Sequence, residues 1–302
     1  MGPDFLYIGC QKAGSRWLYD QLSAHEAFWM PPIKELHYFD GYETGRPIRG
    51  GIAYIALRAE GKTGRQRGLL RELLGGLVMR KDRRLQQAGA AAFIDQVRKG
   101  DFGKLDLDWY ASLFRWKGDR LSGDITPDYS TLSAGTISLI LERFPDLRFI
   151  LFVRDPVARA WSHACQAARR RHKGVAPKDW AEMVSFLTTQ AVAARSYPSQ
   201  IFARWREQVP AERIFVGFFD QLAAEPDVLR ADVLRFLGAG SYPTGIEPEF
   251  DRKRGDVRVP YPPEMQRRLA DWFGDELQAC AGVFGGPAKT WLLRYGPTAT
   301  EA

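Results

Sequence analysis

The chain has 302 residues, a formal net charge of +7 and a pI near 9.3. Hydrophobic residues make up 45% of it and aromatic residues 13%, which is enough for a sizeable core and excludes a disordered chain. The positive charge indicates a surface that attracts anions, such as phosphorylated nucleotides, acidic lipids or nucleic acid. Charge alone does not choose among these partners.

The cysteines and the first residues bear on the cellular setting. Cys10, Cys165 and Cys280 form no Cys-x-x-Cys pair, so we expect neither a disulfide framework nor a zinc cluster, and we expect a reducing, cytoplasmic compartment. Residues 4–9 follow no basic stretch and predict a first strand, not a signal peptide. No run of about 18 apolar residues occurs, so the sequence predicts no membrane-spanning helix.

Short apolar runs alternate with helical patterns along the chain. We expect strands at 5–8, 121–125, 147–153 and 213–218, and helices over about 17–22, 137–141, 156–171 and 199–208. This alternation predicts an α/β fold, with a P-loop-like, doubly wound and mostly parallel sheet that carries helices on both faces. Because no internal repeat or low-complexity linker is present, we expect one domain over residues 1–302, with a basic helical insertion at about 41–105.

The insertion has two interpretations. Residues 58–84 are dense in Arg and Lys, and leucines recur at helical spacing until Gly75 and Gly76 interrupt them, so we expect a kinked or marginal helix. In one interpretation this is a solvated helix whose apolar side packs on the core. In the other it is an interfacial helix, over residues 65–84, that makes a peripheral membrane contact or meets an acidic acceptor.

A first phosphate site is predicted between the first strand and the first helix, at residues 9–15. Free backbone N–H groups at a helix start hold a phosphate, Gly14 lets the backbone approach closely, and Lys12 adds a full positive charge. The alternative is an ordinary turn capped by Ser15. The loop is not a Walker A motif, because Lys12 precedes Gly14 and Ala13 follows the lysine, where a magnesium-binding hydroxyl is needed.

A second phosphate site is predicted after the strand at 147–153. Arg154 follows that strand, and Ser162 comes two helical turns further on, so both side chains are expected at the same anion, with Pro156 fixing the turn. In the alternative interpretation, Arg154 and Asp155 form a surface salt bridge and Ser162 is a neutral helix residue.

The two sites together resemble the sulfotransferase superfamily, in its bacterial and heparan-sulfate branch. Residues 11–17 resemble the family's 5′-phosphosulfate loop, and residues 154–162 resemble its 3′-phosphate motif, with the Arg-to-Ser spacing of eight intact. Further collinear stretches resemble the family at residues 34–39, 123–129, 218–222 and 262–265, together with Tyr197 and Trp205. The family pattern is not kept at Arg16, where a small hydroxyl residue is usual, or at Leu36, where proline is usual.

This resemblance implies a sulfotransferase that uses 3′-phosphoadenosine-5′-phosphosulfate (PAPS), releases adenosine 3′,5′-bisphosphate and needs no metal. The acceptor is then a hydroxyl or amine of a glycan, lipid or small metabolite, and no nucleic-acid partner is expected. The resemblance also implies a set of nucleotide-binding residues: Gln11, Lys12, Ala13, Gly14, Ser15, Arg16, Trp17, Arg154, Ser162, Lys253, Arg254 and Gly255.

Three residues are candidates for the chemistry. Lys12 is expected to neutralise the phosphate leaving group. The base that takes the acceptor proton must be a carboxylate or imidazole, which leaves Glu35 and His37, and the resemblance favours Glu35. The alternatives are a salt bridge of Glu35 with Lys34, and a packed His37 that orients its neighbours.

Asp124 and Thr126 are expected to border the acceptor and the cofactor by the same resemblance, with Asp124 holding Lys12 or Lys34, although a plain turn before proline fits the pattern equally. Three other functions remain open. A P-loop-like kinase would need magnesium, a non-catalytic nucleotide-binding protein would keep the phosphate loops without the chemistry, and a nucleic-acid-binding protein would need aromatics among the basic residues.

Overall fold

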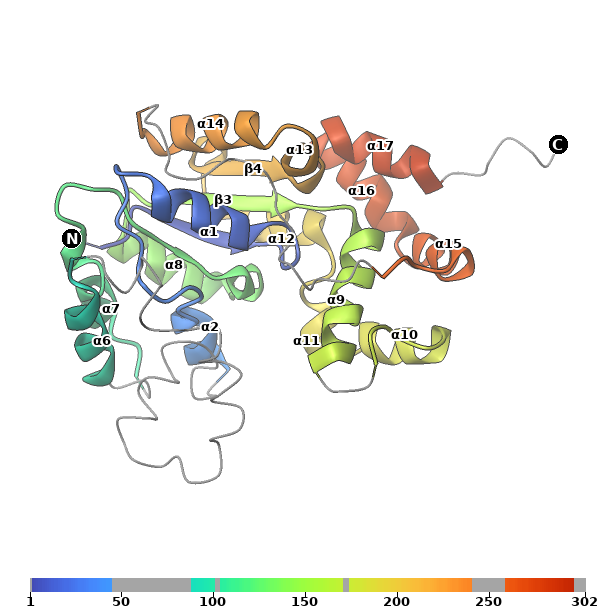
Figure 1. Ribbon diagram of the computed structural model, residues 1–302, viewed down its shortest axis with the longest axis horizontal. Coiled ribbons are helices and arrows are strands. Elements are labelled where there is room, and N and C mark those ends of the chain that lie inside the picture. Colours follow the sequence, from blue (N-terminus) through green and yellow to red (C-terminus); the bar gives the residue numbers. More distant parts are fainter. Residues whose placement is uncertain (1, 45–87, 101–103, 171–173, 241–258, 296–302) are drawn as a thin grey trace, which may run out of the picture.

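The computed structural model of the chain describes residues 2–44, 88–100, 104–170, 174–240 and 259–295 (Figure 1). Within them, four parallel strands form one sheet in the order β2-β1-β3-β4. The strands are β1 (Phe5–Gly9), β2 (Gly123–Ile125), β3 (Arg148–Val153) and β4 (Ile214–Phe218). The predicted strands and the parallel α/β fold are therefore confirmed.

The two central strands are buried along almost their whole length. Every residue of β1 is buried, and in β3 only Arg148 is exposed. Continuous apolar strands of this kind belong to parallel sheets that are covered on both faces. The rings of Tyr7 and Phe152 meet edge to face at 5.6 Å across these strands, and Trp205 packs on Phe149 at 5.1 Å.

Helices cover both faces of the sheet. In the view of Figure 1, α1 passes in front of the strands, whereas α8 and α12 lie behind them. The helices of the first half are α1 (Ser15–Ala24), α2 (Tyr38–Glu43), α6 (Ala90–Arg98), α7 (Leu107–Ser112) and α8 (Ala134–Arg143), with 3₁₀ turns η1 (Arg115–Lys117) and η2 (Pro127–Thr131). None of the helices in the described ranges is long and apolar enough to cross a membrane.

The second half begins with α9 (Pro156–Arg170), which starts at proline as expected. It is followed by α10 (Trp180–Leu187), α11 (Gln190–Ala193), α12 (Pro198–Arg206), η3 (Ala211–Arg213), α13 (Phe219–Ala224) and α14 (Pro226–Leu237). The chain then continues through α15 (Pro263–Trp272), α16 (Gly274–Phe284) and α17 (Gly286–Tyr295). These last three helices gather beyond the carboxyl end of β3 in Figure 1.

The strand order creates a switch point between β1 and β3. From β1 the chain goes on to β2 on one flank of the sheet, and from β3 it goes on to β4 on the other. In open α/β sheets, ligands bind in the crevice at the carboxyl ends of such strands. The loops that follow β1 and β3 both start there, and they carry the two predicted phosphate motifs.

Two parts of the sequence prediction lie outside the described residues. The basic helix expected at 58–84 is one, and the nucleotide-binding residues Lys253, Arg254 and Gly255 are the other. The single domain over residues 1–302, with its insertion at about 41–105, stays a prediction.

Candidate active site

The loop after β1 needs glycine at position 14. Gly14 has φ 108°, in the left-handed region, and a Cβ there would lie 2.4 Å from Cδ2 of Leu222. Any side chain would therefore be strained and would collide with the core. Gly14, and not Ser15, is the N-cap residue of α1, and no side chain caps this helix. Its first N–H groups are thus not used by a capping side chain, which corrects the alternative of a turn capped by Ser15.

The two predicted phosphate motifs meet in the structure. Arg154 Nη1 donates a hydrogen bond of 2.9 Å to the backbone oxygen of Lys12. The Arg154 guanidinium also lies 4.1 Å from the ring centroid of Phe219, at the start of α13. These contacts fix the arginine between the first loop and the end of β4. Arg154 is therefore positioned directly beside the loop that carries Lys12.

Asp155 stabilises the turn at the start of α9 and does not pair with Arg154. Its Oδ1 accepts hydrogen bonds from the N–H groups of Val157 (2.9 Å) and Ala158 (3.3 Å) at the start of α9. Its Oδ2 accepts from Arg294 Nη1 (2.8 Å) and the Tyr295 hydroxyl (2.6 Å) of α17. The interpretation of Arg154 and Asp155 as a mutual salt bridge is therefore wrong. The C-terminal helix instead braces the turn that presents Arg154.

Positive charge gathers where α9 passes the first loop. His163, next to Ser162, is packed edge to face on Phe186, with ring centroids 5.1 Å apart. Burial and the nearby charges of Arg159 and Lys12 lower the pKa of His163 to about 3, and two further arginines add to the effect. The imidazole is therefore neutral, because burial and, after it, the positive potential of the nearby basic side chains disfavour its protonation. Such a potential favours an anion.

Buried donors in α9 also lack partners among the described residues. Nε and Nη1 of Arg159 and Nδ1 of His163 are buried without a hydrogen bond, although Arg159 Nη2 donates to Ser196 Oγ at 2.8 Å. Buried polar groups are normally hydrogen-bonded, so these nitrogens have hydrogen-bonding capacity that the described residues leave unused. The basic residues Lys12 and Arg154 at this end of the sheet suit an anion.

The other predicted residues of the first loop differ in what they do. Arg16 is exposed and pairs with Asp20 one turn along α1, at 3.0 Å. Trp17 is 5% exposed and packs near Phe152 as a core residue, and Ala13 is fully buried. Gln11 donates through Nε2 to Asp128 at 2.8 Å. Nucleotide contacts of Gln11, Arg16 and Trp17 remain predictions.

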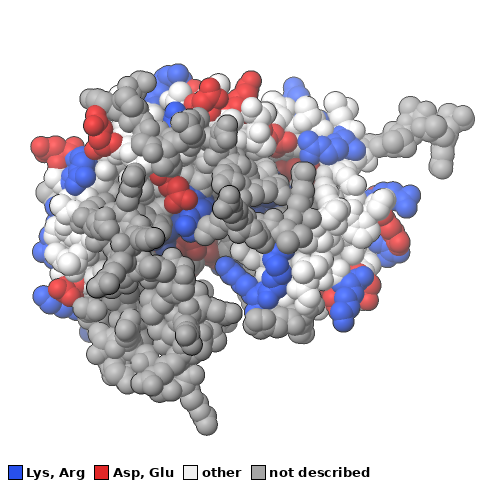
Figure 2. Space-filling model, in the orientation of Figure 1, with Lys and Arg blue, Asp and Glu red and all other residues white. Residues whose placement is uncertain are grey.

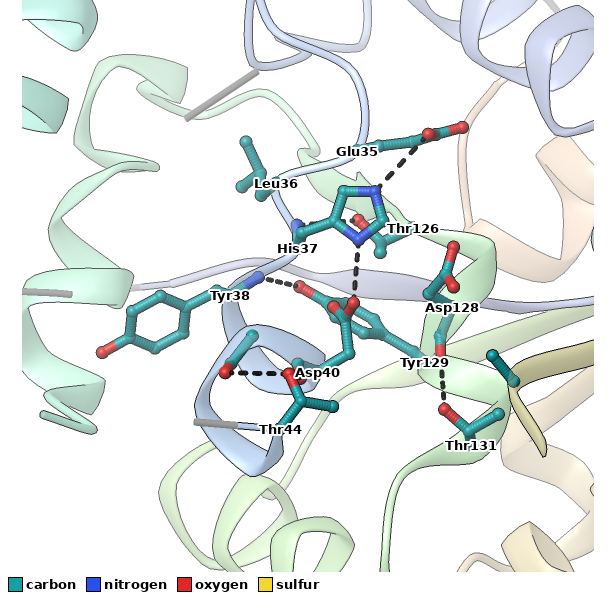
Figure 3. A network of polar contacts seen from close by, with 12 residues as sticks. Glu35, Leu36, His37, Tyr38, Asp40, Thr44, Thr126, Asp128, Tyr129 and Thr131 are labelled. Carbon is teal, nitrogen blue, oxygen red and sulfur yellow. Dashed lines mark hydrogen bonds and ion pairs between the residues drawn. The ribbon is translucent and has the colours of Figure 1, made fainter. Parts of the chain in front are cut away.

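The two candidate bases lie together in a chain of polar contacts (Figure 3). His37 Nδ1 lies 2.8 Å from Asp40 Oδ2, and its Nε2 lies 3.6 Å from Glu35 Oε2. Lys34 Nζ contacts the other carboxylate oxygen of Glu35. The imidazole is 13% exposed and the Glu35 side chain 40% exposed, so Glu35 is the member of this chain that faces outward. The salt bridge of Glu35 with Lys34, raised from the sequence as the alternative to a role as base, is present, and it coexists with the contact to His37.

The charges of the pair follow from these contacts. Burial opposes ionisation of Glu35, but the contact with His37 and the charge of Lys34 outweigh it and lower its pKa to about 2. Burial also opposes protonation of His37, yet the hydrogen bond to Asp40 and the contact with the Glu35 carboxylate raise its pKa to about 10. Near neutral pH, Glu35 is a carboxylate that can accept a proton, whereas His37 is an imidazolium that cannot.

The backbone of this segment is held in an unusual conformation by side chains of β2 and of the turn that follows it. Glu35 and His37 have φ values of 64° and 54°, both left-handed, which non-glycine residues adopt only when neighbouring contacts enforce it. The N–H groups of Leu36, His37 and Tyr38 donate to Asp124 Oδ1 (3.4 Å), Thr126 Oγ1 (3.4 Å) and the Tyr129 hydroxyl (3.2 Å), respectively.

Asp124 is the buried carboxylate that holds the side chains around this segment in place. It is 1% exposed and accepts hydrogen bonds from the hydroxyls of Tyr129 (2.5 Å), Thr126 (2.7 Å) and Tyr110 (3.1 Å). Burial raises its pKa, and these hydrogen bonds oppose the rise. Of the two lysines expected as alternatives beside Asp124, Lys34 pairs with Glu35 and not with Asp124, so that half of the expectation is wrong, and the half that names Lys12 stays a prediction. A role of Asp124 or Thr126 in binding the acceptor remains a prediction.

The raised pKa of His37 makes a prediction about stability. Protonated His37 is stabilised by Asp40 and Glu35 only in the folded state, so its contribution is fully present below pH 6.5 and is lost as the pH rises to about 10. We expect His37→Asn to lower the free energy of unfolding at pH 6 by roughly 2 kcal/mol, typical of hydrogen bonds to charged groups, and by much less near pH 10. Urea denaturation at both pH values measures this. An equal loss at both would contradict a protonated His37.

Comparisons with known proteins agree with this architecture. The sequence profile of the Sulfotransferase family matches residues 3–242, so the chain belongs to the sulfotransferase family. Among curated proteins, no sequence match is significant. A sulfotransferase from Alicyclobacillus acidocaldarius has a similar fold, with a TM-score of 0.62 and 19% identity over 96% of this chain and 99% of that one.

Two further solved structures share the fold at lower identity. The sulfotransferase domain from the curacin biosynthetic pathway has a TM-score of 0.52 and 14% identity, over 91% of this chain and 98% of that domain. Mouse sulfotransferase SULT7A1, solved in complex with PAP, has a TM-score of 0.50 and 11% identity, over 97% of this chain and 88% of its own. At these identities the likeness establishes the fold alone.

Several residues of the site were not singled out from the sequence. Asp40, Asp128 and Arg195 contribute charges, and Tyr129 contributes a hydroxyl, to the network around the candidate base. Asp40 follows His37 by three residues, a spacing at which side chains meet in a helical turn. That spacing was the available signal, but its use requires knowing that a helix begins at Tyr38.

Proposed function

We propose that the protein transfers the sulfuryl group of PAPS to a hydroxyl or amine of an acceptor, with Glu35 as the base and Lys12 at the leaving phosphate. The observation that supports it most is the meeting of the two phosphate motifs at the switch point, where Arg154 bonds to the backbone of Lys12. The sulfotransferase family to which the chain belongs implies the same donor.

The chemistry of the donor matches the groups at this end of the sheet. PAPS carries a 3′-phosphate and a 5′-phosphosulfate, so it needs two anion sites within one nucleotide length. We assign the 5′ end to residues 11–17 and the 3′-phosphate to Arg154 and Ser162. Lys253, Arg254 and Gly255 keep their assignment to the nucleotide as a prediction from the family resemblance.

In the proposed reaction, an acceptor oxygen or nitrogen attacks the sulfur as the bond from sulfur to the 5′-phosphate oxygen breaks. The acceptor proton passes to Glu35, which is ionised at neutral pH. Lys12 stabilises the negative charge that develops on the leaving phosphate, and adenosine 3′,5′-bisphosphate departs. The step needs neither a metal nor a redox partner. Protonated His37, held by Asp40, orients the Glu35 carboxylate.

The acceptor class stays open among glycans, lipids and small metabolites. In Figure 2, acidic and basic side chains of the described residues lie interspersed, and neither kind forms a broad patch on the face shown. On this face, the described residues therefore show no basic stripe of the kind that binds nucleic acid. A peripheral membrane contact through residues 65–84 and a cytoplasmic location remain proposals from the sequence.

The experiment that tests the function uses PAPS labelled with ³⁵S and an extract of the source cells, in the presence of EDTA. We expect label to appear in a product that requires the active protein. Transfer that needs magnesium and a nucleoside triphosphate would support the kinase instead. Binding of adenosine 3′,5′-bisphosphate without any labelled product, from any extract, would support the non-catalytic nucleotide-binding protein.

A further inference from the structure

The segment from Asp124 to Tyr129 touches two functional parts of the site at once. Three of its side chains hold the backbone of residues 36–38, the base loop, through the hydrogen bonds described above. A fourth side chain, Asp128, reaches in another direction. Its Oδ2 accepts a hydrogen bond from Gln11 Nε2 at 2.8 Å, and Gln11 belongs to the loop that follows β1. The base loop and the first phosphate loop are thus connected through a segment of six residues.

Asp128 is firmly fixed in this position. Arg195 donates to its Oδ1 through Nε at 2.7 Å, and Nη2 of the same guanidinium lies 2.5 Å from that oxygen. The side chains of Asp128 and Arg195 are only 17% and 16% exposed. Arg195 Nη1 also donates to the backbone oxygen of Ala191. Charge-assisted hydrogen bonds in such a setting are short and direction-specific, so the carboxylate has little freedom to move.

A carboxylate at this place needs an explanation. A negative charge that contacts a phosphate-binding loop repels the anion that the loop is meant to hold. The positive charge of Arg195 offsets the negative charge of Asp128. The Asp128 carboxylate can therefore accept the hydrogen bond from Gln11 at a fixed position without strongly repelling the anion. In Figure 3, Asp128 points toward the side on which Glu35 lies, and its charge contributes to the raised pKa of His37. The imidazole is thus faced by Glu35 and Asp40 from its own segment and by Asp128 from η2.

The intervening chain is short and stiff. Pro127 begins η2, and the Thr131 hydroxyl closes the turn by donating to the backbone oxygen of Asp128 at 3.0 Å. Asp128 and Tyr129 are neighbours in this turn, and Tyr129 holds Tyr38 N–H. A shift of Gln11 that keeps its bond to Asp128 is therefore passed to η2 and to the base loop, because only this short turn lies between them.

We propose that Asp128 is a positioning residue, which couples the phosphate loop at Gln11 to the placement of His37 and Glu35. The inference rests on the proposed function for the identity of the ligand in that loop. It adds that filling the loop aligns the base, so that proton abstraction becomes efficient only when the donor is present. Neither Asp128 nor Arg195 need touch the donor or the acceptor for this role.

The first test uses the protein without ligand. ¹⁵N-labelled histidine rings are followed by NMR, and His37→Asn assigns the His37 signals among the four histidines. If Asp128 carries the coupling, Gln11→Leu shifts the His37 signals, and the same substitution made on top of Asp128→Asn adds almost no further shift. Non-additivity of this kind identifies residues that act through one another. The inference would be overturned if Gln11→Leu left the His37 signals unchanged, or if the shifts caused by Gln11→Leu and Asp128→Asn were additive. Either result holds whatever the ligand is.

The second test adds adenosine 3′,5′-bisphosphate. In the wild type we expect the His37 signals to change on binding. In Asp128→Asn, the change in the His37 signals on binding should fall to about half of the wild-type change or less. The Kd for the bisphosphate should stay within about threefold of the wild-type value, because a residue that couples two sites alters the response to a ligand, whereas a binding residue alters its affinity. Asp108→Asn is the matched control, because Asp108 forms an exposed ion pair with Arg143 at 2.7 Å and should behave as the wild type.

The two proposals fail in different ways. If the wild type binds no bisphosphate, the assignment of the donor is wrong, and the ligand-free experiment still decides the coupling. If the wild type and Asp128→Asn bind equally and show the same His37 response, the coupling is wrong and the donor assignment stands.

Discussion

Replacing Glu35 with glutamine is expected to reduce sulfuryl transfer by about 10²- to 10⁴-fold, the usual contribution of a general base. Glutamine keeps the shape of the side chain and its hydrogen-bonding capacity but cannot take the acceptor proton. Glu35 has a pKa of about 2 and is therefore the ionised partner, whereas His37 is already protonated below pH 10. The rate is measured with labelled PAPS and the acceptor fraction found with the wild type.

Controls separate this loss from damage to the donor site. Adenosine 3′,5′-bisphosphate should bind to Glu35→Gln within about threefold of the wild-type Kd, because the carboxylate acts on the acceptor. Glu142→Gln, on the exposed side of α8, should keep full activity. His37→Asn should retain measurable transfer, since His37 orients Glu35. If instead Glu35→Gln is active and His37→Asn is inactive, the imidazole is the base; if both retain activity, the base lies elsewhere, with Asp124 the next candidate.

The second large effect is expected for Lys12→Ala. The lysine should interact most strongly with the charge that grows on the leaving phosphate, so the transition state loses more than the ground state. We expect kcat to fall by about 10²- to 10³-fold, comparable to removal of one oxyanion-stabilising donor. The Kd for adenosine 3′,5′-bisphosphate should rise far less. Rates come from the labelled-PAPS assay and affinities from calorimetry.

Lys289→Ala is the matched control for this change. Lys289 is exposed on α17, and its replacement removes the same single positive charge from the chain. It should leave both quantities unchanged. Equal losses of rate and affinity in Lys12→Ala would make Lys12 an ordinary binding residue. An unchanged rate would remove it from the reaction altogether.

The parts of the fold that the sequence predicted share a physical cause. Short apolar runs such as 147–153 are buried on both faces of the sheet and are bounded by turn residues. Their continuous hydrophobicity therefore indicates a buried strand directly. The loop at Gly14 could also be predicted as a phosphate-binding loop, because a lysine and a glycine between a strand and a helix are typical of such loops. Family resemblance then linked this loop to Arg154, which the structure places beside Lys12.

The contacts that the sequence did not predict all depend on long-range packing. Asp155 looked like the partner of Arg154, but its partners Arg294 and Tyr295 lie about 140 positions later in the chain. The left-handed conformations of Glu35 and His37 are imposed by side chains of β2 and of the turn after it, and local propensity argues against them. Asp128 sits within a stretch that was recognised, yet its bonds to Gln11 and Arg195 follow only from the three-dimensional arrangement.

The central claim is that the two motifs form one site for a nucleotide with 3′ and 5′ anionic groups, and calorimetry in EDTA tests it most directly. The wild type should bind adenosine 3′,5′-bisphosphate without metal. Arg154→Ala and Ser162→Ala should weaken that binding by up to several kcal/mol, as expected for a buried phosphate that loses a donor, and should affect adenosine 5′-phosphosulfate far less. Arg235→Ala, at an exposed position on α14, should change neither. No heat with excess bisphosphate, or equal weakening of both ligands, would contradict the account.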